Sequence, residues 1–300
     1  MRKENIQKKE NKKSSGFTTV LLFIVLIVGL ALLLYPTVSD YWNSFTQSKA
    51  VASYAEKLNE IDEDQYAEIW NSAVEYNERL KGLPPGLALT PELESEYYQM
   101  LAVDESGIMG LIEIPSINVS LPIYHGTGDE VLQVAIGHID WTSLPTGGMG
   151  NHTVVSGHRG LPSAKLFTNL DQLREGDIFM LRVLDEILTY EIDMISIIEP
   201  HEVDSIKRHE DMDLCTLMTC TPYGINTHRL LVRGHRVENI EEAKTVRIVG
   251  EARQIDPLIV APIVASPMLL VLFIFILIPR RGKNKKYDES RLLDIVKEDN

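Results

Sequence analysis

The chain has 300 residues, of which 29 are Lys or Arg and 43 are Asp or Glu, so its formal net charge is -14. This length is sufficient for one large domain or two small ones whose core needs neither disulfides nor a metal. The acidic balance argues against a nucleic-acid binder, and an apolar run near each end argues against a soluble cytosolic enzyme.

The two apolar runs predict membrane spans. Residues 17–35 contain 19 residues without a charge, about the length that an α-helix needs to cross the hydrocarbon core. A transmembrane helix or signal anchor is predicted there. A cleaved signal peptide is the alternative, because Thr37-Val38-Ser39 offers small residues and the preceding flank is basic. Residues 258–278 contain 21 uncharged residues with two prolines, which transmembrane helices tolerate, and predict a second span.

The charges beside the runs predict a topology. Residues 1–16 form a basic tail of charge +4, and residues 279–300 form a tail of charge +2. By the positive-inside rule both tails are expected in the cytoplasm. Residues 17–278 carry -20. We therefore expect a protein of the cell membrane whose acidic domain lies outside the cell, with a juxtamembrane linker at residues 239–257.

Residues 40–104 are expected to form extracellular helices and a loop. Apolar side chains recur at helical spacing between Val51 and Val74, with a break around Asp62, which predicts two amphipathic helices. Glycines and prolines at residues 82–86 stop the pattern, and residues 87–104 are expected to be a loop or a short helix.

Residues 105–238 have the pattern of a mainly β domain. The segments are short, rich in β-branched residues and separated by turn residues, which favours a barrel or a sandwich. Eight strands are predicted, at residues 108–114, 117–123, 131–139, 152–156, 178–184, 187–198, 214–220 and 228–237.

The only two cysteines, Cys215 and Cys220, lie in one predicted strand. An extended strand would separate them by roughly 16 Å, whereas a disulfide allows about 7 Å, so they do not form a bridge to each other. Their odd spacing places them on opposite faces. Cys215 is best interpreted as a small buried side chain. Cys220 ends the strand before a turn, where a thiol can meet a substrate, but its position alone leaves the catalytic and structural interpretations open.

The run Thr216-Leu217-Met218-Thr219-Cys220, followed nine residues after the cysteine by Arg229, resembles the signature of sortases, the extracellular cysteine transpeptidases of Gram-positive bacteria. The run Val154-Val155-Ser156-Gly157-His158-Arg159 matches the strand end that carries the catalytic histidine of that family. The resemblance covers residues 105–238. It implies a sortase-like eight-stranded β-barrel, here preceded by amphipathic helices and flanked by two transmembrane helices.

Two features resemble class C, the sortases of pilus assembly: the long run from Thr219 to Arg229 and the second predicted span after the barrel. Class C sortases usually carry a lid with an Asp-Pro-aromatic motif before the barrel. Here the corresponding residues are Leu89-Thr90-Pro91-Glu92, without the Asp or the aromatic residue. The resemblance therefore does not decide whether residues 82–104 form an inhibitory lid.

The resemblance assigns three catalytic residues, and their chemistry suits the roles. Cys220 is the expected nucleophile that forms the acyl-enzyme. His158 is the expected general acid and base, since imidazole titrates near neutrality. Arg229 is the expected stabiliser of the oxyanion and the substrate. Arg233 is its competitor, because it lies four residues away on the same strand face and would alternatively pair with a surface carboxylate.

The other histidines are expected to have structural or solvated roles. Hydrogen-bonded structural positions are predicted for His125, His138, His152, His228 and His235, and solvated positions for His201 and His209. No spacing of His, Cys, Asp and Glu suggests a zinc site, and no glycine-rich phosphate loop is found, so no cofactor and no metal are expected.

The resemblance implies a substrate with an LPxTG-like sorting motif, cleaved between Thr and Gly. The leading hypothesis is a class C sortase that transfers the acyl group to a pilin lysine and so polymerises pili. The second hypothesis is a sortase that attaches surface proteins to the peptidoglycan precursor. The third, of a different class, is a catalytically inactive membrane-anchored binding or scaffold protein.

Overall fold

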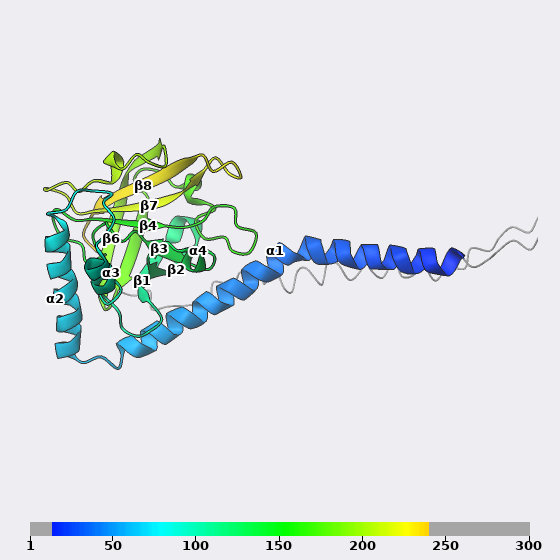
Figure 1. Cartoon of the computed structure of the whole chain (residues 1–300), viewed down its shortest axis with the longest axis horizontal. Helices are drawn as coiled ribbons and strands as arrows, with labels where there is room; N and C mark the ends of the chain where they lie inside the picture. The colour runs from blue at the N-terminus through cyan, green and yellow to red at the C-terminus, as the bar shows by residue number, and fades with distance from the viewer. Residues whose placement is uncertain (1–13, 240–300) are drawn as a thin grey trace, which may run out of the picture. The chain divides into compact units, whose positions relative to one another are not determined.

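The computed structural model describes residues 14–239 of the chain. Four α-helices and eight strands follow one another in this part (Figure 1). The helices are α1 (Ser14–Leu58), α2 (Glu63–Leu80), α3 (Pro91–Tyr97) and α4 (Asp129–Leu132). The strands are β1 (Ile108–Ile114), β2 (Val119–His125), β3 (Ile136–His138), β4 (His152–Ser156), β5 (Ile178–Val183), β6 (Glu186–Ile198), β7 (Leu214–Thr221) and β8 (His228–Arg236). Short 3-10 turns lie at Pro115–Ile117, Leu170–Gln172 and Asp204–Ile206.

Helix α1 contains the first apolar run and continues beyond it. Pro36 lies inside the helix without ending it, so the first amphipathic segment is the carboxyl-terminal part of the same helix. Among the described residues, the stretch Val20–Leu58 is the one helix long and apolar enough to cross a membrane. Its side chains at Val20, Leu22 and Leu33 are exposed, as a surface that faces lipid would be. The predicted linker beyond residue 239, the second span at 258–278 and the tail at 279–300 lie outside the described residues.

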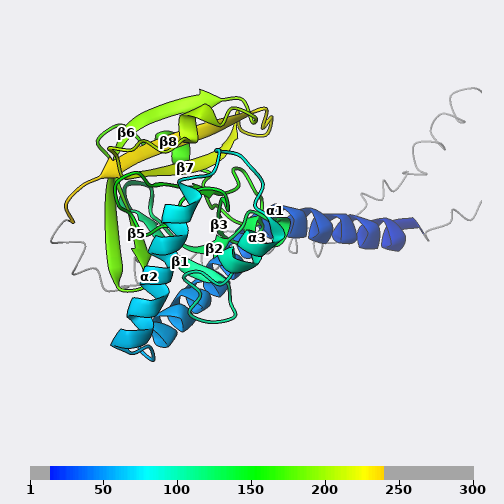
Figure 2. The same ribbon diagram turned by 60° about the vertical axis from the view of Figure 1, so that its left-hand side comes forward.

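Helix α2 begins with a capping box. The Asp62 side chain accepts a hydrogen bond from the Gln65 backbone N–H, and the Gln65 side chain accepts one from the backbone of Asp62. This explains the predicted break at Asp62, because such a cap satisfies the free N–H groups of the first turn. One face of the helix, which carries Ala73, Tyr76 and Leu80, is buried in the core shared with the barrel (Figure 2).

The eight strands close into a barrel in the order β1-β2-β3-β4-β7-β8-β6-β5. The neighbours β2 and β3 run parallel, as do β4 and β7, and the other pairs are antiparallel. The predicted mainly β barrel preceded by helices is therefore confirmed. The parallel contact between β4 and β7 brings together two strands whose paired residues are 62 positions apart, from His152 with Leu214 to Ser156 with Met218.

The third predicted strand is partly wrong. Residues 129–132 form helix α4, and only Ile136–His138 pair as β3. Gly128 precedes the helix, and Asp129 and Glu130 occupy its first turn, where acidic side chains favour a helix start. The apolar residues of this segment suited either structure, so the composition of the first turn was the better guide.

Two apolar clusters lie on opposite sides of the barrel wall. The main core fills the interior and includes Val155, Cys215, Leu217, Leu230 and Val232. The second cluster is outside, formed by Val154, Ile198, Ile206 and Leu231, with Ile139, Trp141, Val203 and Met218 packed against it. The outer face of β4, β7 and β8 is therefore covered in its middle by the connection from β6 to β7, residues 199–213.

Candidate active site

Cys220 and Arg229 face each other across neighbouring strands. They are direct register partners in the antiparallel pair of β7 and β8. Directly opposed residues have Cβ atoms about 4.5–5.5 Å apart and point to the same face of the sheet. The fold therefore places the expected nucleophile and the expected oxyanion stabiliser together.

The face they share is the outer one. Cys215 and Leu217 of β7, and Leu230 and Val232 of β8, point into the main core. Side chains alternate along a strand, so Cys220 and Arg229 point the opposite way. Both are partly exposed, as a group that meets a substrate must be.

His158 follows the end of β4 and lies beside Cys220 on the neighbouring strand β7. The last pair of the parallel contact is Ser156 with Met218, so two residues further along each chain lie His158 and Cys220. The backbone continues this alignment, since the Gly157 N–H donates to the Met218 carbonyl at 3.1 Å. Thr219 Oγ1 donates to the Gly157 carbonyl at 2.7 Å. The three predicted site residues are thus brought to one end of one outer face.

Two glycines bracket His158 for steric reasons. A Cβ at Gly157 would lie 2.9 Å from the Phe167 ring and closer still to Ile136, so this position points into the core and turns His158 outward. Gly160 has φ +74° and faces the Tyr223 ring, whose Cε2 a Cβ would approach to 2.7 Å. A side chain at either position would displace the loop that carries His158.

The surroundings of Arg229 and Arg233 differ. Arg233 makes a bidentate ion pair with Asp193, with N–O distances of 2.9 and 3.0 Å. Arg229 donates only to the carbonyl oxygens of Asn226 and His228, at 3.4 and 3.2 Å. Within residues 14–239 no carboxylate pairs with Arg229, so its charge stays available to an anionic group. This favours Arg229 over Arg233 for the oxyanion.

The two thiols also differ. Cys215 is fully buried, and burial raises the pKa of its thiol well above the usual value, with Asp213 adding to the effect. Both cysteines are free, which agrees with their prediction as unbridged. A buried protonated thiol is inert, whereas the thiol of Cys220 is partly accessible.

Of the five histidines expected in structural positions, His125, His138 and His152 are buried and hydrogen-bonded, whereas the His228 ring hydrogen-bonds only to the neighbouring Thr227 among the described residues and His235 is partly exposed beside Asp193. His138 is enclosed by Tyr97 and Ser143, and burial lowers its pKa to about 3. His152 bridges Lys207 and Thr216, and burial lowers its pKa to about 4. His125 is held by two backbone carbonyls.

The segment at residues 82–90 lies against the β6–β7 connection. A Cβ at Gly86 would lie 3.3 Å from Val203, and Leu83 lines a cavity together with Ile206. The segment then enters α3, which Thr90 caps. Residues 87–104, for which a loop or a short helix is expected, therefore contain the short helix α3.

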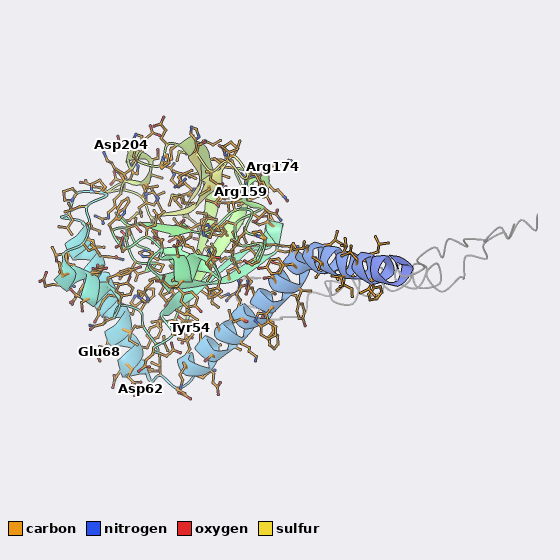
Figure 3. All side chains as sticks on the ribbon, turned by 45° about the vertical axis from the view of Figure 1, so that its right-hand side comes forward. Tyr54, Asp62, Glu68, Arg159, Arg174 and Asp204 are labelled. Carbon is orange, nitrogen blue, oxygen red and sulfur yellow. The ribbon has the colours of Figure 1, made fainter. Side chains whose placement is uncertain are left out.

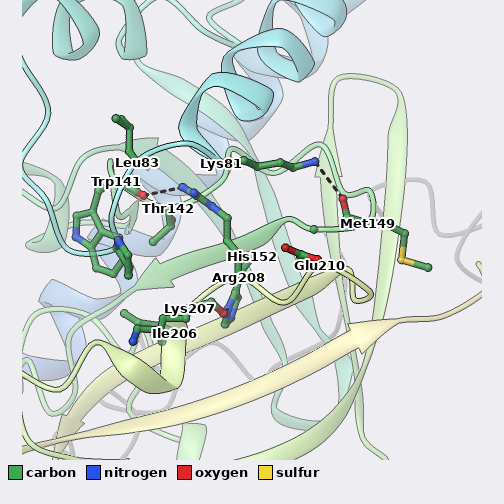
Figure 4. A pocket seen from close by; sticks show the side chains of 12 residues that line it. Lys81, Leu83, Trp141, Thr142, Met149, His152, Ile206, Lys207, Arg208 and Glu210 are labelled. Atoms are coloured by element: carbon green, nitrogen blue, oxygen red, sulfur yellow. Dashed lines mark hydrogen bonds between the residues drawn. The ribbon is translucent and has the colours of Figure 1, made fainter.

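The cavity of about 660 Å³ beside this segment is distinct from the predicted site (Figure 4). It is lined by Lys81, Leu83, Trp141, Met149, His152 and Arg208, among others. His152 begins β4, and His158 follows its other end, roughly 20 Å along an extended chain. Arg208 donates to the carbonyls of Leu80 and Trp141, so it joins α2 to two loops. None of the predicted catalytic residues lines this cavity.

In residues 14–239 there is no cluster of three or more His, Cys, Asp or Glu side chains suited to a metal.

One side chain that shapes the site, Arg159, was not among the predicted site residues. Arg159, next to His158, makes contacts to the segment after Cys220 that no spacing in the sequence announces. Its place beside the predicted histidine was the one available signal.

A sortase domain model matches residues 112–237. Among solved structures, sortase C1 from Streptococcus agalactiae is 45% identical, and the match covers 64% of this chain and 100% of that one with a TM-score of 0.63. Sortase C of Streptococcus pneumoniae, whose structure is described as informative on pilin substrate specificity, is 40% identical, with 64% and 97% covered and a TM-score of 0.58. Sortase D of Bacillus subtilis is 30% identical over 131 residues, which are 43% of this chain and 63% of that protein's length.

The two solved relatives share the fold of this chain over the part they cover, and the sortase domain model spans the region that contains the three predicted residues. Because a solved sortase C1 is matched over its entire length at 45% identity, the chain belongs to the sortase family of cysteine transpeptidases, in class C.

Proposed function

We propose that this chain cleaves an LPxTG-like sorting motif between Thr and Gly and transfers the acyl group to a pilin lysine, and so polymerises pili. The observation that carries the proposal is the placement of Cys220 opposite Arg229, with His158 at the adjoining strand end, on one outer face of the barrel. The similarity to sortase C of Streptococcus pneumoniae, whose structure is described in terms of pilin substrate specificity, supports a pilin as substrate.

Cys220 supplies the nucleophile. A thiolate attacks the Thr carbonyl, the C–N bond to Gly breaks, and a thioester holds the motif on the enzyme. The amine of a lysine then attacks the thioester, which releases the thiolate and forms an isopeptide bond. Cys220 lies one residue before the end of β7 and is partly exposed, so a peptide can reach its sulfur from solvent.

His158 and Arg229 serve the two charge changes of this reaction. The leaving amine takes up a proton and the lysine amine gives one up, and an imidazole does both near neutral pH. The tetrahedral intermediate carries a negative oxygen, toward which the guanidinium of Arg229 is free of any carboxylate partner in the described part of the chain.

We further infer that the barrel, residues 105–238, works outside the cell at the membrane surface, with residues 17–35 as its anchor. The apolar, exposed amino-terminal half of α1 supports this. In this arrangement the predicted second span, residues 258–278, holds the chain from its other end, and both tails are cytoplasmic. Pilins that are still anchored in the same membrane then reach the site as substrates.

The test is intact mass of the full-length protein in detergent after incubation with an LPxTG peptide. The wild type and Cys215→Ala are expected to gain the mass of the acylated motif, and Cys220→Ala to gain none. Addition of a peptide with a free lysine should discharge the adduct and yield a branched peptide of the summed mass.

The outcomes separate the parts of the proposal. An adduct that survives Cys220→Ala would contradict the nucleophile. An adduct that is discharged by a peptidoglycan-precursor amine but not by lysine peptides would contradict pilus polymerisation while leaving the transpeptidase. Absence of any adduct across several motif variants would favour an inactive binding protein.

A further inference from the structure

Arg159 connects the segment after His158 to the segment after Cys220. One of its terminal nitrogens donates to Thr221 Oγ1 at 3.2 Å, and the other pairs with Asp171 at 2.5 Å. Arg159 directly follows His158, and Thr221 directly follows Cys220. The contact therefore joins the segment after β4 to the end of β7, next to the two expected catalytic residues.

This contact is the second of two links around His158. On the amino-terminal side, Gly157 is bonded to β7 through the Met218 carbonyl and the Thr219 hydroxyl. On the carboxyl-terminal side, Arg159 is bonded to Thr221. The His158 carbonyl itself accepts a hydrogen bond from the Phe167 N–H at 3.2 Å. His158 is thus held between two attachments to the strand that carries Cys220.

Arg159 also holds the loop between β7 and β8. Its guanidinium lies 5.9 Å from the centre of the Tyr223 ring, and that ring packs on Gly160. A cation–π contact of this kind attracts the guanidinium weakly to the ring at an exposed site. Tyr223 is 61% exposed, so this contact and Gly160 are among its few neighbours. One side chain therefore contacts both the histidine loop and the turn beyond the cysteine.

The burial of Arg159 indicates a specific role. Its side chain is only 9% exposed, whereas its partner Asp171 is 48% exposed. Its Nε is buried without a hydrogen-bond partner among the described residues. Burial of a guanidinium with one nitrogen unsatisfied costs free energy, and the half-exposed ion pair returns little of it. An arginine used only to pair with Asp171 could remain in solvent.

We propose that Arg159 is a positioning residue for the transpeptidation reaction, which sets the approach of His158 to the Cys220 sulfur through Thr221 and Tyr223. The inference rests on the proposed function. Arg159 touches neither the substrate nor the reacting atoms in this role. A misplacement of about 1 Å in a catalytic group can cost on the order of 100-fold in rate, so a small relaxation of this link is measurable.

The experiment compares Arg159→Gln, Arg159→Lys and Thr221→Val in full-length protein on a Cys215→Ala background. Arg174→Gln is the matched control, since Arg174 is an exposed arginine on the same domain (Figure 3). With a sorting-motif peptide, Arg159→Gln is expected to lower kcat by about 10- to 100-fold with KM nearly unchanged. Arg159→Lys keeps the charge beside Asp171 and should recover part of the loss. The control should match the wild type.

Two further readouts distinguish positioning from a structural role. The double variant Arg159→Gln/Thr221→Val should be no slower than Arg159→Gln alone, because both substitutions remove the same link. The pH profile of Cys220 alkylation by iodoacetamide should differ from that of the wild type in Arg159→Gln and in Thr221→Val, because His158 then meets the thiol in a different geometry. A structural role alone would lower the melting temperature and leave the kcat of folded protein and the alkylation profile unchanged.

Each result decides the question. If Arg159→Gln does not fold, Thr221→Val, which removes a single hydroxyl, carries the test. Wild-type kcat and alkylation profile in the folded variants would overturn the proposal. If the wild type and Arg174→Gln form no acyl adduct, the proposed function fails, and the alkylation profiles still report whether Arg159 controls the surroundings of Cys220.

Discussion

Arg229 and Arg233 lie four positions apart on the same face of β8, and their neighbours separate their roles. Asp193 engages Arg233 with two hydrogen bonds, and both side chains are about four-fifths buried. Arg229, beside Cys220, has only backbone carbonyls as partners within the described residues. One arginine is therefore suited to stability and the other to chemistry.

Arg229→Gln is expected to lower the reaction rate, and Arg233→Gln is expected to lower the stability of the fold. The first should lower the rate of acyl-enzyme formation by about 100- to 1000-fold with little change in melting temperature, because it removes a donor to the oxyanion. The second should leave the rate per folded molecule near that of the wild type and lower the unfolding free energy by about 1–3 kcal/mol, because Asp193 loses its partner. Single-turnover mass spectrometry and urea unfolding measure the two quantities. A large rate loss in Arg233→Gln alone would reverse the assignment.

The two thiols are expected to react at different stages of unfolding. Cys215 is fully buried with a raised thiol pKa, and Cys220 is partly exposed. An aromatic disulfide reagent at pH 8 should therefore titrate one thiol in the native protein and two in guanidinium chloride. Native Cys220→Ala should react with none. Fast reaction of two thiols in the native wild type would show that the strand opens around Cys215.

At the scale of elements, one side chain fastens α2 to the barrel. Asn77 is fully buried, and its amide donates to the Leu144 carbonyl and to Thr146 Oγ1. Its own carbonyl accepts the Leu144 N–H at 2.7 Å. The helix is thereby joined to the connection that leads from β3 to β4, the strand before His158.

Asn77→Ala is expected to destabilise the protein by about 2–4 kcal/mol, because it leaves buried backbone groups of Leu144 without partners. Asn71→Ala is the matched control, since Asn71 is the same residue type on an exposed face of the same helix. It should change stability by less than about 0.5 kcal/mol. Thermal unfolding of both variants tests this, and equal effects would mean that the Asn77 contacts contribute nothing beyond helix propensity.

For the molecule as a whole, the buried histidines make the fold sensitive to acid. The pKa of His138 is lowered to about 3 and that of His152 to about 4, in both cases by burial. His125 adds a smaller repulsion at His138, and Arg233 and His209 do so at His152. In the unfolded chain both imidazoles take up a proton at about pH 6.5, whereas in the folded chain they stay neutral until a lower pH. Stability is therefore complete above about pH 6.5 and falls as the pH drops toward the folded-state values.

The unfolding free energy should fall between pH 6.5 and 4.5 with a slope of up to about 1.4 kcal/mol per pH unit for each histidine. Urea unfolding at several pH values measures this slope. His152→Gln should reduce the slope, whereas His201→Gln, on a side chain that is 79% exposed, should leave it unchanged. A slope in His152→Gln equal to that of the wild type would contradict burial as its cause.

Much of this arrangement could be predicted from the sequence because local patterns determine it. Strand alternation placed Cys215 inside and Cys220 outside, and Asp62 marked the start of α2. The pairing of Arg233 with Asp193, and of Arg159 with Thr221, depends on which strands become neighbours and in what register, 40 and 62 residues apart. No local pattern contains that information, so these partners became known only from the folded chain.

The parallel contact between β4 and β7 has a consequence for biogenesis. The chain leaves β4 at Ser156 and must complete β5 and β6 before β7 lies beside it. Such long-range pairings form late, since loop closure precedes any gain from the contact. During synthesis, a thiol at position 220 therefore emerges after its histidine but acquires that neighbour only when the barrel closes. The proposed reactivity is thus coupled to completed folding, and with the proposed location outside the cell, the chain would cross the membrane before Cys220 and His158 are brought together.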